Sequence, residues 1–156
     1  MANGAFVPAG TSGAIAVYPT NDTDLLIDIN GYFAGQSSSG LSLYTLAPCR
    51  VIDTRNVGNG QPFQGERTVN AAFSACAPSS SAQAYVFNAT VVPPGGLGYL
   101  TLWPDGENQP LVSTLNAVDG SITSNMAIVP TNNGSIDAYA SALTQLILDI
   151  SSYFAP

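Results

Sequence analysis

The stretch Leu25–Ala34, LLIDINGYFA, returns near the carboxyl terminus as Leu146–Ala155, LILDISSYFA. The offset between the copies is 146 − 25 = 121 residues, and farther upstream the same offset pairs Tyr18 with Tyr139. A period of this length is the size of a domain and is much longer than the repeats of solenoid proteins. The chain therefore contains the end of one repeat followed by one whole repeat.

The repeat divides the 156 residues into three parts. Residues 1–35 are predicted to be the C-terminal hairpins of a preceding repeat, because they are a partial copy of residues 127–155. Residues 36–40 are rich in Ser and Gly and predict a flexible linker. Residues 41–156 form one complete repeat. We expect the parts either to pack into one compact unit or to exchange strands between chains.

Charged residues are scarce, at 8% of the chain, and the net charge is −7 at pH 7. The only cations are Arg50, Arg55 and Arg67, so the sequence contains neither lysine nor histidine. Binding to nucleic acid through its phosphates needs clustered cations, which this sequence does not have. An anionic membrane surface would repel the protein, and no apolar run is long enough to span a bilayer. We therefore expect neither a nucleic-acid partner nor membrane insertion.

Cys49 and Cys76 are the only two cysteines, and we predict that they form a disulfide. Two reduced, buried thiols are the alternative. Metal binding is disfavoured, because the sequence has no histidine and no closely spaced cysteine pair. The polar, weakly charged composition is common in exported bacterial proteins. We expect an extracellular or cell-surface location, although residues 1–10 carry no signal-peptide pattern.

Short runs of β-branched and aromatic residues alternate with turn signals, and no stretch has helical periodicity. The sequence thus predicts an all-β fold, an antiparallel β-sandwich or alternatively a β-barrel, with about a dozen short strands and no significant helix. Asp119-Gly120 and Asn132-Asn133-Gly134 predict hairpin turns, and residues 56–66 predict a surface loop. The expected strands include 5–8, 13–18, 25–33, 41–46, 67–73, 84–92, 98–103, 111–118, 122–129, 135–140 and 145–154, the last two forming a hairpin.

Several motifs occur in a fixed order along the chain. They are Ala47–Arg55 (APCRVIDTR), Phe87–Val92 (FNATVV), Gly98–Pro104 (GYLTLWP), Ser113–Asn116 (STLN) and Leu148–Phe154 (LDISSYF). Taken together, they resemble an uncharacterised tandem module of secreted and surface-attached bacterial proteins. The resemblance covers residues 44–155 once and residues 5–34 in part, and it implies an extracellular accessory module without an assigned activity. The sequence departs from the pattern at Ser151-Ser152, where the pattern has a glycine before the Tyr-Phe pair.

Four charged residues are candidates for a structural ion pair or hydrogen-bond network. Asp53 and Arg55 lie two residues apart on a predicted strand, so they share a face. Asp28 and Asp149 occupy equivalent positions in apolar strands, where a carboxylate must be hydrogen-bonded or shifted in pKa. A paired-carboxylate glycosidase site is the catalytic alternative. Because no nucleophile or base accompanies these residues, we predict no catalytic residue, no enzyme activity and no cofactor.

Two loops carry oxygen ligands that are weak candidates for calcium: Asp22 and Asp24 in one loop, and Asp105 and Glu107 in the other. Neither loop has a complete ligand pattern, and ordinary turn chemistry explains both, so we predict no metal site.

Four aromatic residues are of the kind that stacks on sugar rings. They are Tyr18, Tyr99, Trp103 and Tyr139. In all-β proteins such residues more often fill the core or pack across strands.

The main functional hypothesis is an extracellular structural module, a building block of a surface stalk, adhesin or fibre. In this hypothesis the N-terminal hairpin is donated to a neighbouring copy, so the expected partners are copies of the chain itself or adjacent repeats. The alternative is a carbohydrate-binding module of a secreted protein, with glycans as partners.

Overall fold

The computed structural model describes residues 4–5, 7–29, 31–35 and 40–156. This part of the chain is all-β, as predicted, and almost free of helix. No helix in it is both long and apolar enough to cross a membrane. Its strands are β1 (Ser42–Asp53), β2 (Phe63–Asn70), β3 (Ala84–Val92), β4 (Leu97–Pro104), β5 (Leu115–Ala117), β6 (Thr123–Pro130) and β7 (Ser135–Ala155), and its 3-10 turns are η1 (Thr11–Gly13) and η2 (Thr54–Asn56).

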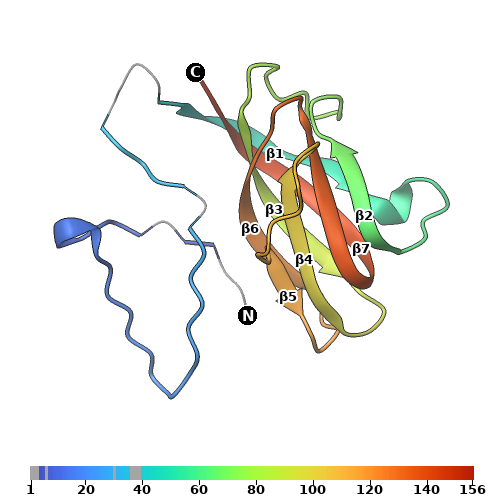
Figure 1. Cartoon of the computed structure of the whole chain (residues 1–156). Coiled ribbons are helices and arrows are strands. Elements are labelled where there is room, and N and C mark those ends of the chain that lie inside the picture. Colours follow the sequence, from blue (N-terminus) through green and yellow to red (C-terminus); the bar gives the residue numbers. More distant parts are fainter. Residues whose placement is uncertain (1–3, 6, 30, 36–39) are drawn as a thin grey trace.

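The long strand β7 is the centre of the sheet and pairs antiparallel with four other strands (Figure 1). Its first half lies between β2 and β4, and its second half lies between β1 and β3. β6 and β5 add to β3 and β4, which gives the order β5-β4-β7-β3-β6, with β1 and β2 on the other edge of β7. Each strand of the sheet therefore pairs with β7 or with a strand that does.

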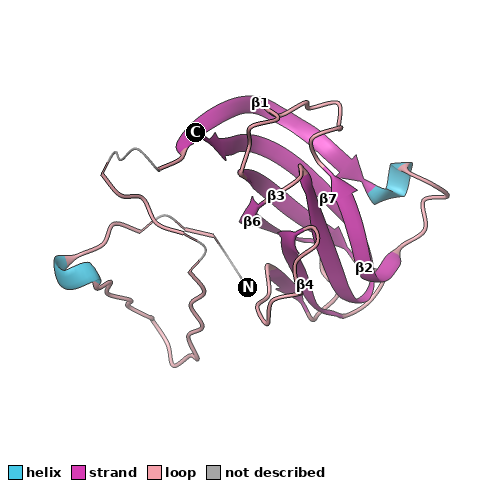
Figure 2. Cartoon of the chain, turned by 45° about the horizontal axis from the view of Figure 1, so that its top comes forward, coloured by secondary structure: helices cyan, strands magenta, loops and turns pink. Residues whose placement is uncertain are grey.

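The strands that flank β7 come in consecutive pairs. β1 is followed along β7 by β2, and β3 is followed by β4, while β5 and β6 run back along β4 and β3. The sheet thus consists of four long rows: β1 with β2, β7 alone, β3 with β4, and β6 with β5. Each row bends or breaks near its middle, and there the sheet folds over until it is nearly closed (Figure 2). The largest side chains buried in the enclosed core are Tyr85, Phe87, Leu97, Leu100, Leu115, Ile136, Leu146, Leu148 and Ile150.

Buried polar groups hold the bend of β7. The Gln145 side-chain amide donates to the Gly60 carbonyl at 2.7 Å, and the Leu146 amide donates to Thr54 Oγ1 at 2.9 Å. Thr54 Oγ1 in turn donates to Gln145 Oε1. In the described residues no buried side-chain nitrogen or oxygen lacks a hydrogen-bond partner. These bonds replace ladder bonds at the place where β1 gives way to β2.

The prediction of about a dozen short strands is wrong, partly because bends were read as breaks. Residues 135–140 and 145–154 do not form a hairpin but belong to the one strand β7. The segment between them, SALT, contains none of the residues Gly, Pro, Asn and Asp that favour turns. Thr144 instead continues the pairing, opposite Phe63 of β2, so β2 begins inside the predicted surface loop 56–66.

The turns at Asp119-Gly120 and Asn132-Asn133-Gly134 change the direction of the chain but do not close hairpins. Their glycines have φ of 77° and 85°, which glycine adopts at little cost. β5 pairs with β4, and both β6 and β7 pair with β3. The hairpin prediction is wrong, because turn residues specify a local reversal, whereas burial of the apolar faces decides which strands pair.

The described residues before residue 36, here called the arm, form no strand. The strands predicted at 5–8, 13–18 and 25–33 are therefore absent there; residues 6 and 30, and most of the predicted linker 36–40, lie outside the described residues. A strand needs a hydrogen-bonded neighbour, and the position for which 25–33 is patterned is filled by β7. The arm extends away from the sheet (Figure 1).

The arm touches the sheet near both of its ends. The Gly4 amide donates to Asn125 Oδ1 of β6 at 2.7 Å. The rings of Phe33 and Phe154 lie with centroids 5.9 Å apart. These contacts hold the arm beside the outer side of the β1-β7-β3-β6 half of the sheet.

A β-bulge interrupts β7 at Ser151. Val86 of β3 lies opposite Ser152, whereas the next residue of β3, Phe87, lies opposite Ile150. Neither serine is among the described residues with positive φ. The bulge therefore does not require the glycine that the resembling module has here.

Candidate functional site

Cys49 and Cys76 form a disulfide, as predicted, with their Cα atoms 5.6 Å apart. Cys49 lies at an irregular point of the β1–β7 pairing, and Cys76 lies in the segment that leads from β2 to β3. That segment carries the chain from one edge of β7 to the other. The disulfide thus fastens the crossover to β1, and no other cysteine is present to exchange with it.

Arg50 and Asp149 form a bidentate ion pair across the β1–β7 ladder. The Arg50 Nε donates to Asp149 Oδ1 at 2.7 Å and Nη2 donates to Oδ2 at 3.1 Å. The two residues are direct cross-strand partners. The hydrogen bond to Asp149 raises the pKa of Arg50, although half of the arginine side chain remains exposed. Asp149 thus lies in the predicted kind of network, but its partner Arg50 was missed.

Asp53 and Arg55 pair as expected, but at the end of a strand and not along its face. Asp53 is the last residue of β1, and its carboxylate caps the η2 turn by accepting from the Arg55 amide at 3.1 Å. The Arg55 guanidinium also donates to it at 2.8 Å and 2.6 Å. The Asp53 side chain is only 4% exposed. The hydrogen bonds from Arg55 lower the pKa of Asp53 in spite of its burial.

The two pairs are linked, because Arg50 Nη1 also reaches Asp53 Oδ2 at 3.3 Å. The result is a chain of alternating charge, Asp149, Arg50, Asp53 and Arg55, at the junction of β1 and η2. Asp28 is not part of it. It lies exposed on the arm, although its sequence position corresponds to that of Asp149.

The acidic loop residues do not form a metal site in the described residues, where no three His, Cys, Asp or Glu lie close enough to share an ion. Asp105 accepts from the Asn133 side chain at 2.7 Å, and Glu107 accepts from Asn132 at 3.3 Å. Both carboxylates thus tie the β4–β5 loop to the β6–β7 turn. Asp22 and Asp24 lie exposed on the arm.

The four aromatic candidates lie in three different settings. Trp103 is 3% exposed, and its Nε1 donates to the Glu107 carbonyl at 2.9 Å, so its ring is not available to a ligand. Tyr18 lies exposed on the arm. Tyr99 and Tyr139 lie on the outer face of neighbouring strands, with stacked rings 5.7 Å apart.

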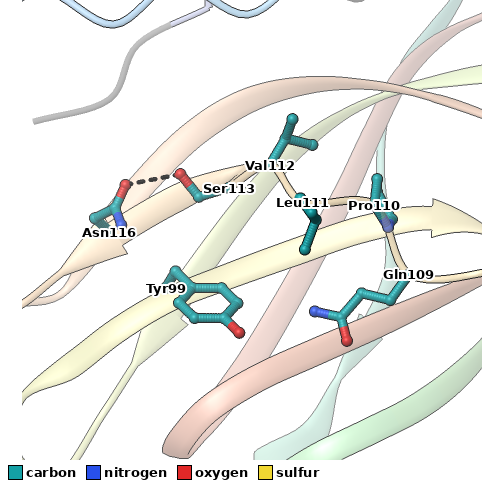
Figure 3. A pocket seen from close by; sticks show the side chains of 7 residues that line it. All are labelled: Tyr99, Gln109, Pro110, Leu111, Val112, Ser113 and Asn116. Carbon is teal, nitrogen blue, oxygen red and sulfur yellow. Dashed lines mark hydrogen bonds between the residues drawn. The ribbon is translucent and has the colours of Figure 1, made fainter.

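A shallow hollow of about 300 Å³ adjoins Tyr99 (Figure 3). The segment from Gln109 to Ser113 forms its wall, and the Ser113 hydroxyl is bonded to Asn116 Oδ1 at 3.0 Å. This segment covers the outer face of β4, where the Thr101 hydroxyl donates to the Val112 carbonyl at 2.7 Å. The prediction of a strand over residues 111–118 is wrong for this wall, because only Leu115–Ala117 form a strand (β5) and residues 109–113 form the wall.

The side chains that most often act in catalysis are few in this chain. The sequence has neither histidine nor lysine, and its cysteines are oxidised. The two buried carboxylates of the outer surface, Asp53 and Asp137, accept hydrogen bonds from Arg55 and Thr68. Both carboxylates therefore serve as hydrogen-bond acceptors within the fold.

Comparisons with models of known protein families, with curated proteins and with solved structures found no match to this chain.

Proposed function

We propose that this protein is an extracellular structural module, a building block of a surface stalk, adhesin or fibre that assembles by donating its N-terminal arm to a neighbour. One observation carries the proposal. The arm has the sequence of a buried strand, yet its apolar side chains are exposed, with Leu26 at 87% and Ile29 at 85%. Isolated apolar strands of this kind are used for strand addition to a partner sheet.

Two further features agree with a role outside the cytosol. The disulfide is of the kind that persists in oxidising compartments. The surface depends on Ser, Thr, Asn and Gly for its polarity, since only 8% of residues are charged. Such a surface has few long side chains that would have to be ordered in a packed assembly.

The two halves of the bent sheet support a sandwich as the finer description of the fold. We base this on the pairing: in the described residues β6 pairs only with β3, and β1 pairs only with β7. Edge amides of β1 and β6 are then expected to exchange with solvent faster than those of β7, whereas a closed barrel would protect both.

The assembly is tested by light scattering and negative-stain microscopy on the full chain and three variants. One variant lacks residues 1–35. The second, Leu26→Asp with Ile29→Asp, keeps the arm but makes it polar. The third is a matched control, Val118→Asp with Ile122→Asp, which changes two residues that are 77% and 69% exposed outside the arm.

We expect oligomers or filaments from the full chain and from the control, and monomers from both arm variants. A compact monomer for the full chain at all concentrations contradicts donation. Oligomers that persist in both arm variants also contradict it.

The second candidate function is carbohydrate binding, favoured by the stacked Tyr99 and Tyr139 beside the hollow. Flat aromatic faces next to amide groups such as those of Gln109 and Asn116 suit a pyranose ring. Screening on a glycan array tests this candidate. A hit should be lost with Tyr99→Ala and retained with Phe73→Ala, since Phe73 is 87% exposed elsewhere. The absence of hits on a broad array contradicts it.

A further inference from the structure

The arm corresponds to one defined part of the sheet, the second half of β7. At the offset of 121 residues, residues 23–29 (TDLLIDI) align with residues 144–150 (TQLILDI). Six of these seven positions are identical or exchange Leu for Ile, and Asp28 falls on Asp149. The chain therefore encodes the same strand segment twice and uses one copy in its own sheet.

The position of this segment in the sheet restricts which residues can occupy it. In β7 the side chains of Leu146, Leu148 and Ile150 are fully buried, and Ile147 is 7% exposed on the opposite face. β1 and β3 occupy the two edges of the segment. A strand buried on both faces and paired on both edges leaves little freedom in sequence. The arm has apolar residues at the corresponding positions: Leu25, Ile27 and Ile29 on one face and Leu26 on the other.

The acidic residue sets the register. Asp149 is held by two hydrogen bonds from Arg50 of β1, its cross-strand neighbour. A shift of one residue along the ladder would put the carboxylate on the core side. In the arm, Asp28 has the same spacing from the apolar residues but lies exposed, and in the described residues no arginine donates to it.

One feature limits the match to this half of β7. Pro19 aligns with Ala140, which pairs with strands on both edges. Proline has no amide hydrogen for the ladder and is confined to strand edges. The part of the arm before residue 23 is therefore not included in the match.

A module whose sheet is complete has no position between β1 and β3 left for the arm. The described residues contain two copies of the segment but only one pair of strands, β1 and β3, to receive one. In the chain itself β7 fills the position. The remaining copy requires a module of the same type in which the position is vacant. In oligomers of the unmodified chain, the arm would therefore take the place of the acceptor's own residues 144–150.

We infer that residues 23–29 bind between β1 and β3 of a second copy of this module whose own residues 144–150 do not occupy that position, with Asp28 beside Arg50 of that copy. This inference rests on the strand donation proposed above and specifies the acceptor. It also identifies the partner by its chemistry: two strand edges, an apolar floor and an arginine in register.

The test uses full-length variants in which either copy of the segment is disabled. Leu148→Asp places a charge in the core and vacates the position, because Leu148 is fully buried. Ile27→Asp disables the arm at a side chain that is 54% exposed. The double variant has neither copy. Folding is followed by near-ultraviolet circular dichroism and by thermal unfolding.

We expect the Ile27→Asp variant to unfold like the unmodified chain. The Leu148→Asp variant should keep a cooperative transition, because the arm of its own or of a neighbouring chain enters the vacant position. The double variant should have none. If the Leu148→Asp variant is as unfolded as the double variant, the inference is overturned.

Two further experiments test the register of the bound arm and its binding to another chain. In the Leu148→Asp background, Asp28→Arg should lower the midpoint of the transition, whereas Asp22→Arg, which changes the net charge equally, should leave it unchanged. Unmodified chain added to the double variant should form a complex with it on size exclusion, and Ile27→Asp chain should not. Equal effects of the two arginine substitutions contradict the register, and capture by both chains contradicts the role of the arm.

Failure here is distinct from failure of the assembly proposal. Arm-dependent oligomers of the unmodified chain together with an unfolded Leu148→Asp variant would mean that the arm is donated to a free sheet edge instead.

Discussion

Removal of the disulfide is expected to destabilise the fold by more than any exposed ion pair contributes. The bond closes a loop with a sequence separation of 27. In the loop-entropy relation this separation gives about 12 cal/mol/K, or about 3.6 kcal/mol at 25 °C. The loop includes the end of β1, all of η2 and β2, and residues 71–76 of the crossover to β3, and β2 does not pair with β1. The unfolded chain therefore gains freedom over this whole stretch when the bond is opened.

The measurement is urea unfolding of the unmodified chain, oxidised and reduced, beside the variant Cys49→Ala with Cys76→Ala. The reduced chain and the variant should both lose about 3–4 kcal/mol of unfolding free energy. Agreement between them shows that the loss comes from the crosslink and not from the packing of the partly buried sulfur atoms. If both lose less than about 1 kcal/mol, the crossover is already restrained in the unfolded state, and the entropic reasoning is refuted.

Three further changes follow from individual contacts. Asp53→Asn should lower the free energy of unfolding by about 1–3 kcal/mol. The pKa of Asp53 in the folded protein lies below the ordinary 3.8, so its carboxylate stabilises the fold above that pH. The urea midpoints of the variant and the unmodified chain should therefore differ above that pH and converge as the pH falls through the folded pKa. Arg50→Ala should cost less than about 1 kcal/mol in the same assay, since 49% of its side chain is exposed; a larger loss contradicts the assignment as a surface pair. Ser152→Gly should lower the unfolding free energy by about 0.5–1 kcal/mol, because the bulge does not need glycine; a gain contradicts this.

The strand content was predictable from the sequence, but the number of strands was not. Alternating runs such as residues 84–92 and 98–103 appear as β3 and β4 almost unchanged. The error lies between them. Pro93-Pro94-Gly95-Gly96 signals an end of the strand, and it does interrupt the ladder, yet β4 continues along the same edge of β7. A local signal does not distinguish a bend from a reversal, because the difference lies in the pairing with a strand 50 residues away, such as that of Val92 with Gln145 (145 − 92 = 53).

The same limit applies to the charged residues. Asp53 and Arg55 are neighbours in sequence, so their pairing followed from spacing alone. Arg50 and Asp149 are 99 residues apart, and only the register of β1 against β7 brings them together. The hollow beside Tyr99 depends on how the segment 109–113 lies over β4, for which the sequence has no periodic signal.

The topology makes β7 the strand on which the rest of the sheet depends, so a second copy of its sequence matters more than a copy of another strand would. Among the described residues, β1 and β2 have no neighbour in the sheet other than β7, and Ser42 pairs with Ala155, 155 − 42 = 113 residues later. Until the last strand is placed, these two strands have no ladder, and contacts of such long range form slowly. The strand edges of β1 and β3 are therefore open in any chain whose last strand is missing or detached. Residues 23–29 carry the same side-chain pattern as the strand that closes those edges. On the proposed donation, we therefore expect the arm to select an incomplete module over a finished one.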